Sequence, residues 1–319
     1  MEPVLQRLGT IGIIPVIQLD VASDAVALGQ ALLQGGIPAA EVTFRSDAAE
    51  ETIAAMTTEI PELLVGAGTV LTATQAGQAI RAGAQFIVSP CYQEEVVDHC
   101  IERHVPVLPA ITNPDGIARG QARGFEALKF FPAESFGGTA ALDAFSGPFK
   151  SMRFIPTGGI NITNLPNYAC RRNVLAVGGS WMVNSDLIAA KDWDGIIRLC
   201  KESVIVLHGF TFAHIEICTH SAKQNQSMTD TISRLFALSN HSNTNWASSG
   251  GYLEITHAPG IDKTGQIAIR CNQLERAVAY LSTLGIIARP ETATRAKGRC
   301  TSVFLDVDLD GFTVHLVQK

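Results

Sequence analysis

The sequence predicts an α/β protein in which a (β/α)8 barrel is followed by a smaller α+β domain. Over roughly the first 200 positions, short apolar runs rich in β-branched residues recur about every 25 residues, and a helix-like stretch follows each run. After residue 204 the pattern changes to an alternation of apolar and polar residues, which predicts half-buried antiparallel strands. We therefore expect two domains, residues 1–204 and residues 205–319.

Eight apolar runs are the predicted barrel strands. Because they are apolar throughout and alternate with helices, they predict a parallel sheet that is covered on both faces. Eight nearly regular units favour a closed barrel over a doubly wound open sheet, which is the structural alternative. The predicted strands are residues 13–18, 40–44, 64–70, 86–90, 105–111, 128–132, 153–159 and 174–180.

The second domain shows a faint internal repeat of strand patterns around one clear amphipathic helix, residues 274–284. The connecting residues 201–210 are too apolar for a flexible linker and predict a packed junction. The polar stretch 221–245 is predicted to be a flexible loop. The predicted strands are residues 212–217, 251–256, 266–270, 302–307 and 312–317.

Composition limits the possible functions. The chain has 319 residues, 46% of them hydrophobic, and a formal net charge of −6, which argues against general binding to nucleic acid or to an anionic membrane surface. Small anionic substrates need only a local positive site. The seven cysteines are scattered without a C-x-x-C pair, and no apolar run is long enough to span a bilayer. We expect a cytoplasmic protein with reduced thiols.

Lys129 is the most informative single residue, because it lies in the apolar run ALKFFP, residues 127–132. A buried ammonium group is costly among apolar neighbours, so such a site favours the neutral amine, which attacks carbonyl groups. A lysine so placed is the expected nucleophile of a Schiff-base enzyme. Because strand side chains alternate, Lys129 and Phe131 are predicted to share the face that points into the barrel.

Reactive residues of a parallel barrel belong at the C-terminal ends of its strands. There the sequence places Glu41 and Arg45 on either side of the end of the second predicted strand, Thr69 at the end of the third and Pro90 at the end of the fourth. Taken alone, Glu41 and Arg45 could equally form a local ion pair at the end of a strand. Their combination with Lys129 indicates a catalytic site instead.

Two glycine pairs follow the seventh and eighth predicted strands, where many such barrels bind phosphate. Glycines let backbone N–H groups approach an anion, and a hydroxyl residue stands beside each pair. The alternative is that both pairs are tight turns that need glycine torsion angles. The candidate phosphate site consists of Thr157, Gly158, Gly159, Gly179 and Ser180.

The first 200 residues resemble a known family, the class I aldolases that cleave 2-keto-3-deoxy-6-phosphogluconate (KDPG) and 4-hydroxy-2-oxoglutarate (KHG). The resemblance covers the whole predicted barrel and rests on six motifs in the same order. They are EVTFR (41–45), VGAGTV (65–70), AQFIVSP (84–90), KFFPAE (129–134), PTGGI (156–160) and GGSW (178–181). One departure is Ala110, where relatives often carry glycine, and it bears on the width of the pocket rather than on the mechanism.

The resemblance implies a role for each candidate residue. Lys129 forms the Schiff base and Glu41 is the acid/base. Arg45 and Thr69 hold the pyruvyl carboxylate, Pro90 and Phe131 line the pocket, and Gly158, Gly159 and Ser180 receive the phosphate. The barrel needs no metal or other cofactor, its substrate is a small keto acid, and the family implies a homotrimer. We expect KDPG to be the better substrate and KHG to be cleaved as well.

Residues from about 210 onward resemble, more weakly, the glyoxalase-like (vicinal oxygen chelate) architecture of paired βαβββ modules. In that superfamily four strand positions supply ligands to a divalent metal, and here they are His214, Glu254, Gln266 and His315. The alternative is that these are ordinary polar residues of a purely structural module. Two other functions stay open, a bifunctional enzyme with metal-dependent chemistry in this module and a non-catalytic barrel that binds a sugar phosphate.

Overall fold

A computed structural model of the chain describes residues 2–219, 221–236, 240–242, 246–249, 252–256 and 265–319. These residues fall into two compact units, Met1–Leu207 and His208–Lys319. The boundary that the sequence places after residue 204 lies inside a helix, α10 (Trp193–His208), so most of the predicted connection is helical. Within the described part of the chain, no helix has the length and apolar character needed to cross a membrane.

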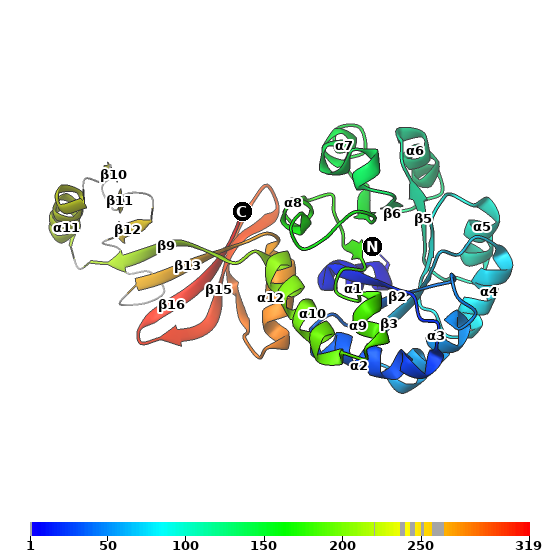
Figure 1. Ribbon diagram of the computed structural model, residues 1–319. Coiled ribbons are helices and arrows are strands. Elements are labelled where there is room, and N and C mark those ends of the chain that lie inside the picture. The colour runs from blue at the N-terminus through cyan, green and yellow to red at the C-terminus, as the bar shows by residue number, and fades with distance from the viewer. Residues whose placement is uncertain (1, 220, 237–239, 243–245, 250–251, 257–264) are drawn as a thin grey trace. The chain divides into compact units, whose positions relative to one another are not determined.

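The first unit is a parallel eight-stranded barrel, as the sequence predicts (Figure 1). Its strands are β1 (Ile13–Ile17), β2 (Ala39–Thr43), β3 (Leu64–Gly68), β4 (Ile87–Ser89), β5 (Val107–Ile111), β6 (Ala127–Phe130), β7 (Arg153–Pro156) and β8 (Val177–Gly179). They are ordered β7-β6-β5-β4-β3-β2-β1-β8, and two parallel bridges, Phe154 with Val174 and Thr157 with Gly178, join β7 to β8. This closure argues against the open-sheet alternative.

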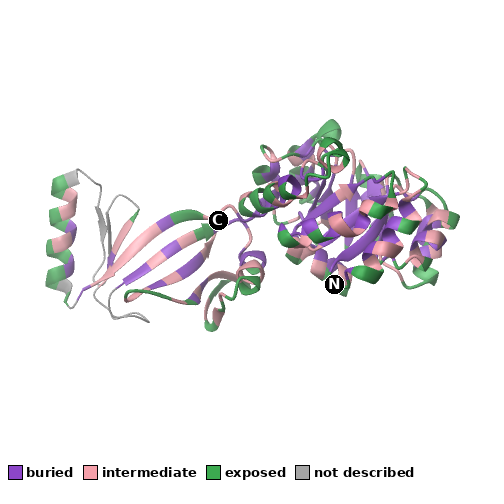
Figure 2. Cartoon of the chain, turned by 60° about the horizontal axis from the view of Figure 1, so that its bottom comes forward, coloured by how far each residue is buried: buried purple, intermediate pink, exposed green. Residues whose placement is uncertain are grey.

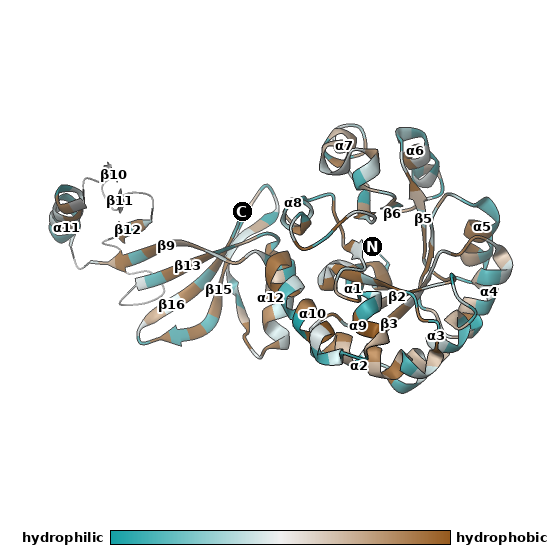
Figure 3. Ribbon diagram, viewed as in Figure 1, coloured by the Kyte–Doolittle hydropathy of each residue, from teal (hydrophilic) through white to brown (hydrophobic). Residues whose placement is uncertain are grey.

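Helices alternate with these strands and surround the barrel, except α1, which precedes β1 and packs at the N-terminal end of the barrel (Figure 1). They are α1 (Pro3–Ile11), α2 (Ala25–Gln34), α3 (Ala49–Glu59), α4 (Ala73–Arg81), α5 (Glu94–Glu102), α6 (Pro114–Ala122), α7 (Gly138–Phe145), α8 (Leu165–Ala169), α9 (Ser185–Ala189) and α10. Figures 2 and 3 show buried, apolar strands inside and polar, exposed faces on the helices. Several strands are shorter than predicted. The seventh ends at Pro156 because Gly158 and Gly159 adopt positive φ values of 96° and 78°.

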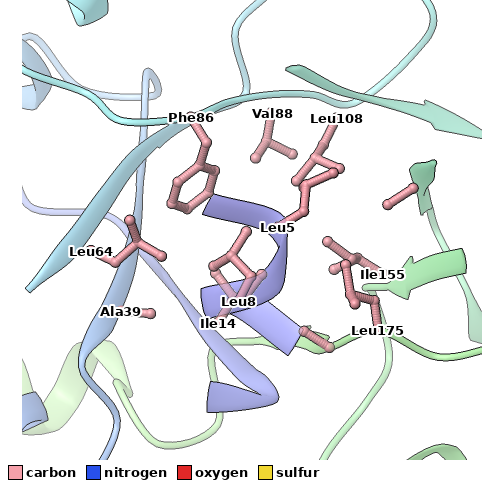
Figure 4. Packing of buried hydrophobic residues seen from close by; sticks show 12 residues of the cluster. Leu5, Leu8, Ile14, Ala39, Leu64, Phe86, Val88, Leu108, Ile155 and Leu175 are labelled. Atoms are coloured by element: carbon pink, nitrogen blue, oxygen red, sulfur yellow. The ribbon is translucent and has the colours of Figure 1, made fainter. Parts of the chain in front are cut away.

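An apolar cluster fills the N-terminal end of the barrel. Leu5 and Leu8 of α1 pack there against residues at or just before the start of several strands, among them Ile14, Leu64 and Phe86 (Figure 4). Leu8 and Phe86 are completely buried. Each fully buried side chain of this size contributes about 1.5–3 kcal/mol of hydrophobic free energy. The cluster closes this end of the barrel, so the opening lies at the C-terminal ends of the strands.

The second unit consists of two β-α-β-β-β repeats that form one sheet, in agreement with the internal repeat seen in the sequence. The first strand of each repeat is parallel to its fourth, and the two first strands pair antiparallel. The first repeat is β9 (Thr211–Cys218), α11 (Ala222–Phe236), β10 (Asn240–Ser242), β11 (Trp246–Ser249) and β12 (Leu253–Thr256). The second is β13 (Gly265–Cys271), α12 (Leu274–Thr283), β14 (Ala288–Ala296), β15 (Arg299–Leu309) and β16 (Phe312–Gln318).

The prediction of a loop over residues 221–245 is wrong for α11, while residues 237–239 and 243–245 of that stretch lie outside the described residues. The buried face of α11 carries polar side chains. Asn225 donates a hydrogen bond through Nδ2 to the carbonyl of Ile255 at 3.0 Å, and the Thr229 hydroxyl donates to the carbonyl of Asn225 at 2.9 Å. Because these polar contacts take the place of apolar ones, α11 is less hydrophobic on average than α12, which favoured the prediction of a loop.

His208 makes the second unit sensitive to acid. Its ring is buried and stacks on Tyr280, with ring centroids 4.5 Å apart. Burial, with a smaller contribution from the charge of Arg276, lowers the pKa of His208 to about 4. In the unfolded chain the group protonates near pH 6.5, so between pH 6.5 and 4 the unfolded state binds more protons. Stability is therefore lost as the pH falls through this window.

We expect the free energy of opening of β13 and β16 to fall by about 2 kcal/mol between pH 7 and pH 5 from His208 alone. Peptide-resolved hydrogen exchange, corrected for the intrinsic exchange rate, measures this change. A His208→Gln variant, which cannot titrate, should lose this part of the pH dependence. An identical pH dependence in the variant would show that another group is responsible.

Candidate active site

Lys129 and Glu41 form a buried ion pair across the barrel interior. Lys129 lies on β6 and Glu41 on β2, with three strands between them in the barrel order. Lys129 Nζ is 3.0 Å from Glu41 Oε1, and the two residues are only 5% and 2% exposed. An amine and a carboxylate held at this distance can exchange a proton directly. Glu41 is thus paired with the lysine and not with Arg45, the local pairing that the sequence left open.

Gly68 makes room for this pair. A Cβ atom at Gly68 would lie 2.3 Å from Glu41 Oε1, so any larger residue on this part of β3 would displace the carboxylate. Gly68 was not among the residues predicted to form the site. The available signal was its place in the motif GAGT, next to a strand end that carries a candidate residue.

A cavity of about 190 Å³ opens at the C-terminal ends of the strands around this ion pair. Every barrel residue that the sequence singled out for the site lines it. These are Glu41, Arg45, Thr69, Pro90, Lys129, Phe131, Thr157, Gly158, Gly159, Gly179 and Ser180. Val16 and Ile160 also line the cavity and were not predicted, because an apolar residue next to a strand end gives no chemical signal.

Thr69 and Arg45 occupy the side of the cavity formed after β3 and β2. Thr69 has φ of 55°, a left-handed conformation that is unusual for a β-branched residue and that clusters at functional sites. Arg45 is exposed at the cavity rim. A guanidinium and a hydroxyl on one wall can bind a carboxylate by charge and hydrogen bonding.

Phe131 and Lys129 lie on the same face, as the alternation of side chains predicts. Phe131 comes directly after the end of β6, and its N–H donates to the carbonyl of Ile111 at 3.3 Å. The Lys129 Nζ atom is 5.4 Å from the centroid of the Phe131 ring. The ring therefore provides an apolar wall beside the amine, and Pro90 lines the same cavity.

The two glycine pairs, one after β7 and one in β8, have steric roles of their own. Gly158 and Gly159 adopt positive φ, and a Cβ at Gly178 would lie 2.3 Å from the Thr157 hydroxyl oxygen. A Cβ at Gly179 would lie 1.9 Å from the Trp181 ring. Torsion angles that favour glycine are therefore present after β7, whereas the pair in β8 is required by close packing, and residues of both pairs line the cavity.

The four predicted metal ligands of the second unit lie on adjacent strands, but they do not converge. His214 Nδ1 is 3.8 Å from Glu254 Oε1, and the rings of His214 and His315 are 5.7 Å apart. Gln266 is paired in register with Glu216, whereas His214 and His315 both pair with Ala268. The set is therefore spread over two rows of the sheet. Over the described residues, no three His, Cys, Asp or Glu side chains are grouped to hold a metal ion.

Comparison with known proteins matches residues 4–199 to the family model described as KDPG and KHG aldolase. The 2-dehydro-3-deoxy-phosphogluconate aldolase of Treponema pallidum is 45% identical over 207 residues, which are 65% of this chain and 99% of that protein. The KHG/KDPG aldolase of Escherichia coli K12 is 41% identical over 192 residues, which are 60% of this chain and 90% of that protein.

Solved structures give the same result. The barrel is similar to a KDPG aldolase from Legionella pneumophila in which pyruvate was captured as a covalent carbinolamine, with a TM-score of 0.60 and 36% identity. That similarity covers 62% of this chain and 96% of the Legionella chain. The matched family model spans more than half of the sequence, including the whole cavity. The chain belongs to the KDPG and KHG aldolase family.

Proposed function

We propose that the protein is a class I aldolase that cleaves KDPG to pyruvate and glyceraldehyde 3-phosphate, and KHG to pyruvate and glyoxylate. The observation that carries the proposal is the buried contact between Lys129 Nζ and Glu41 Oε1 at 3.0 Å inside the barrel mouth. An amine nucleophile beside a proton-transferring carboxylate is the arrangement that Schiff-base chemistry needs. A barrel that only binds a sugar phosphate has no use for such a pair, which argues against the non-catalytic alternative.

In the proposed mechanism, Lys129 attacks the C2 ketone of the substrate and forms a carbinolamine. Loss of water gives an iminium ion whose positive nitrogen accepts electrons. Glu41, through a water molecule, takes the proton of the C4 hydroxyl, and the C3–C4 bond breaks to release the aldehyde and leave an enamine on Lys129. Glu41 then returns the proton to C3, and hydrolysis of the iminium releases pyruvate and the free amine.

The other cavity residues support a fixed orientation of the substrate. Arg45 and Thr69 are proposed to hold the C1 carboxylate, while Pro90 and Phe131 line the space around the reacting carbons. The phosphate group is proposed to bind where the loops after β7 and β8 meet, at Thr157, Gly158, Gly159, Gly179 and Ser180, all of which line the cavity. Backbone N–H groups of glycine loops are suited to phosphate oxygens.

Comparison of the two substrates tests this orientation. We expect kcat/KM to be higher for KDPG than for KHG, because only KDPG carries the phosphate. Ser180→Ala should lower kcat/KM for KDPG about tenfold, the scale of one hydrogen bond to a charged group, and leave KHG cleavage unchanged. Ser146→Ala, at an exposed serine outside the cavity, is the matched control. Equal losses on both substrates would remove Ser180 from the proposed phosphate site.

A second candidate function is metal-dependent chemistry in a glyoxalase-like second unit. The β-α-β-β-β repeats and the 3.8 Å contact between His214 and Glu254 favour it, while the spread of the four predicted ligands over two rows argues against it. Elemental analysis of the whole protein after incubation with divalent ions, with His214→Ala as control, tests it.

A homotrimer and a cytoplasmic location stay predictions, and light scattering coupled to gel filtration tests the trimer.

A further inference from the structure

Glu134 lies directly against the loop that follows β7. The N–H of Ala133 donates to the carbonyl of Thr157 at 2.8 Å, and the N–H of Glu134 donates to the carbonyl of Gly158 at 3.2 Å. A Cβ atom at Gly159 would lie 2.7 Å from the Glu134 Cβ, so no side chain fits between them. An acidic residue is therefore packed against the glycine pair that lines the cavity.

Tyr168, on α8, holds this carboxylate from the other side. The Tyr168 hydroxyl donates a hydrogen bond to Glu134 Oε1, and the tyrosine is completely buried. Burial, followed by the bond to Glu134, raises the pKa of Tyr168, so the hydroxyl keeps the proton that it donates. Gly138 keeps the space open, because a Cβ there would lie 3.0 Å from Glu134 Oε1 and 3.1 Å from the Tyr168 hydroxyl oxygen.

The Glu134 side chain packs against the glycine loop, and its carboxylate would oppose the binding of a phosphate group if it turned toward that loop, because like charges a few ångströms apart repel. We propose that Tyr168 is a positioning residue that determines the preference for phosphorylated substrates, because it fixes the Glu134 carboxylate against α8 and away from the phosphate. The inference rests on the proposed function, in which Gly158 and Gly159 receive that phosphate. Without the tyrosine hydroxyl, the charged side chain is free to turn toward the loop.

The test is the kinetics of Tyr168→Phe with KDPG and with KHG. We expect KM for KDPG to rise about tenfold while kcat changes less than twofold, and KM for KHG to stay within twofold of the wild type. The rise should shrink at high salt, which screens the repulsion. The double variant Glu134→Gln/Tyr168→Phe should recover the wild-type KM for KDPG, because glutamine keeps the size of the side chain without its charge.

Tyr92→Phe is the matched control. Its hydroxyl is also buried, has no hydrogen-bond partner within the described part of the chain, and lies outside the catalytic cavity, so neither KM should change. If Tyr168→Phe does not fold, Glu134→Gln alone should give a KM for KDPG equal to or below that of the wild type. A tenfold higher KM in that variant overturns the inference.

The outcomes separate this inference from the proposed function. Wild-type protein that cleaves neither substrate overturns the proposed function and the inference with it. Normal wild-type cleavage combined with an unchanged KM for KDPG in Tyr168→Phe overturns the inference alone. A rise of KM for both substrates, or a double variant that recovers nothing, shows a structural role for Tyr168 and also overturns it.

Discussion

We expect Lys129→Met to abolish the cleavage of both KDPG and KHG. Because the variant has no amine to form the iminium ion, we expect kcat/KM to fall by a factor on the order of 10⁴ or more, the scale of loss when a covalent nucleophile is removed. Pyruvate release measured with a coupled assay detects this loss. Substrate binding through the carboxylate and the phosphate should be weakened far less, because neither group contacts the amine in the proposed orientation.

The fold of this variant needs a control of its own. Lys129→Met leaves the Glu41 carboxylate buried without its partner at 3.0 Å, and an unpaired buried charge costs about 3–5 kcal/mol. The double variant Lys129→Met/Glu41→Gln removes that charge and should recover much of the lost stability in thermal unfolding while staying inactive. Lys129→Met protein that is folded and retains the wild-type rate would refute the Schiff-base mechanism.

Glu41→Gln is expected to have the second largest effect. A positioned general acid/base contributes about 10²–10⁴-fold, so kcat for KDPG should fall by that factor. The same group is proposed to return the proton to the enamine. The exchange of the pyruvate methyl protons in D₂O, followed by NMR, should therefore slow by a similar factor, and this readout needs no aldehyde.

An exposed carboxylate supplies the comparison for Glu41. Glu95 lies in the first turn of α5, outside the cavity lining. The Glu95→Gln variant should therefore catalyse the exchange of pyruvate methyl protons and the cleavage of KDPG at wild-type rates. If Glu41→Gln retained normal methyl exchange but lost cleavage, the enamine would be protonated by another group. Glu41 would then act only on the C4 hydroxyl.

Much of the site could be predicted because its signals are local. Lys129 is a charge within an apolar strand, and Thr69 and Thr157 follow directly after strands. Residues that follow parallel strands meet at one end of a barrel. These residues could therefore be predicted to line a single cavity, as they do. Gly68 was missed because glycine is required there only by the Glu41 side chain on the neighbouring strand, which leaves no room for a Cβ atom. Such a steric requirement exists only after the strands pair.

The second unit was harder to predict for two physical reasons. Helix α11 buries polar groups such as Asn225, so it is less hydrophobic on average than α12, and β14 has no apolar alternation that distinguishes it from a loop. The arrangement of the predicted metal ligands depends on strand pairing. His214 and His315 both pair with Ala268, whereas Gln266 pairs with Glu216, and which side chains share a row is set by a register that leaves no mark in the sequence.

The Schiff base on Lys129 is tested most directly by the intact mass of the protein after incubation with pyruvate and sodium borohydride, followed by peptide mapping. Borohydride reduces an iminium ion to a stable amine, so the Schiff base becomes a permanent adduct. We predict one reduced pyruvyl group per chain, located on Lys129. No adduct on folded protein, or an adduct on a different lysine that persists in Lys129→Met, would contradict the proposal that Lys129 forms the Schiff base.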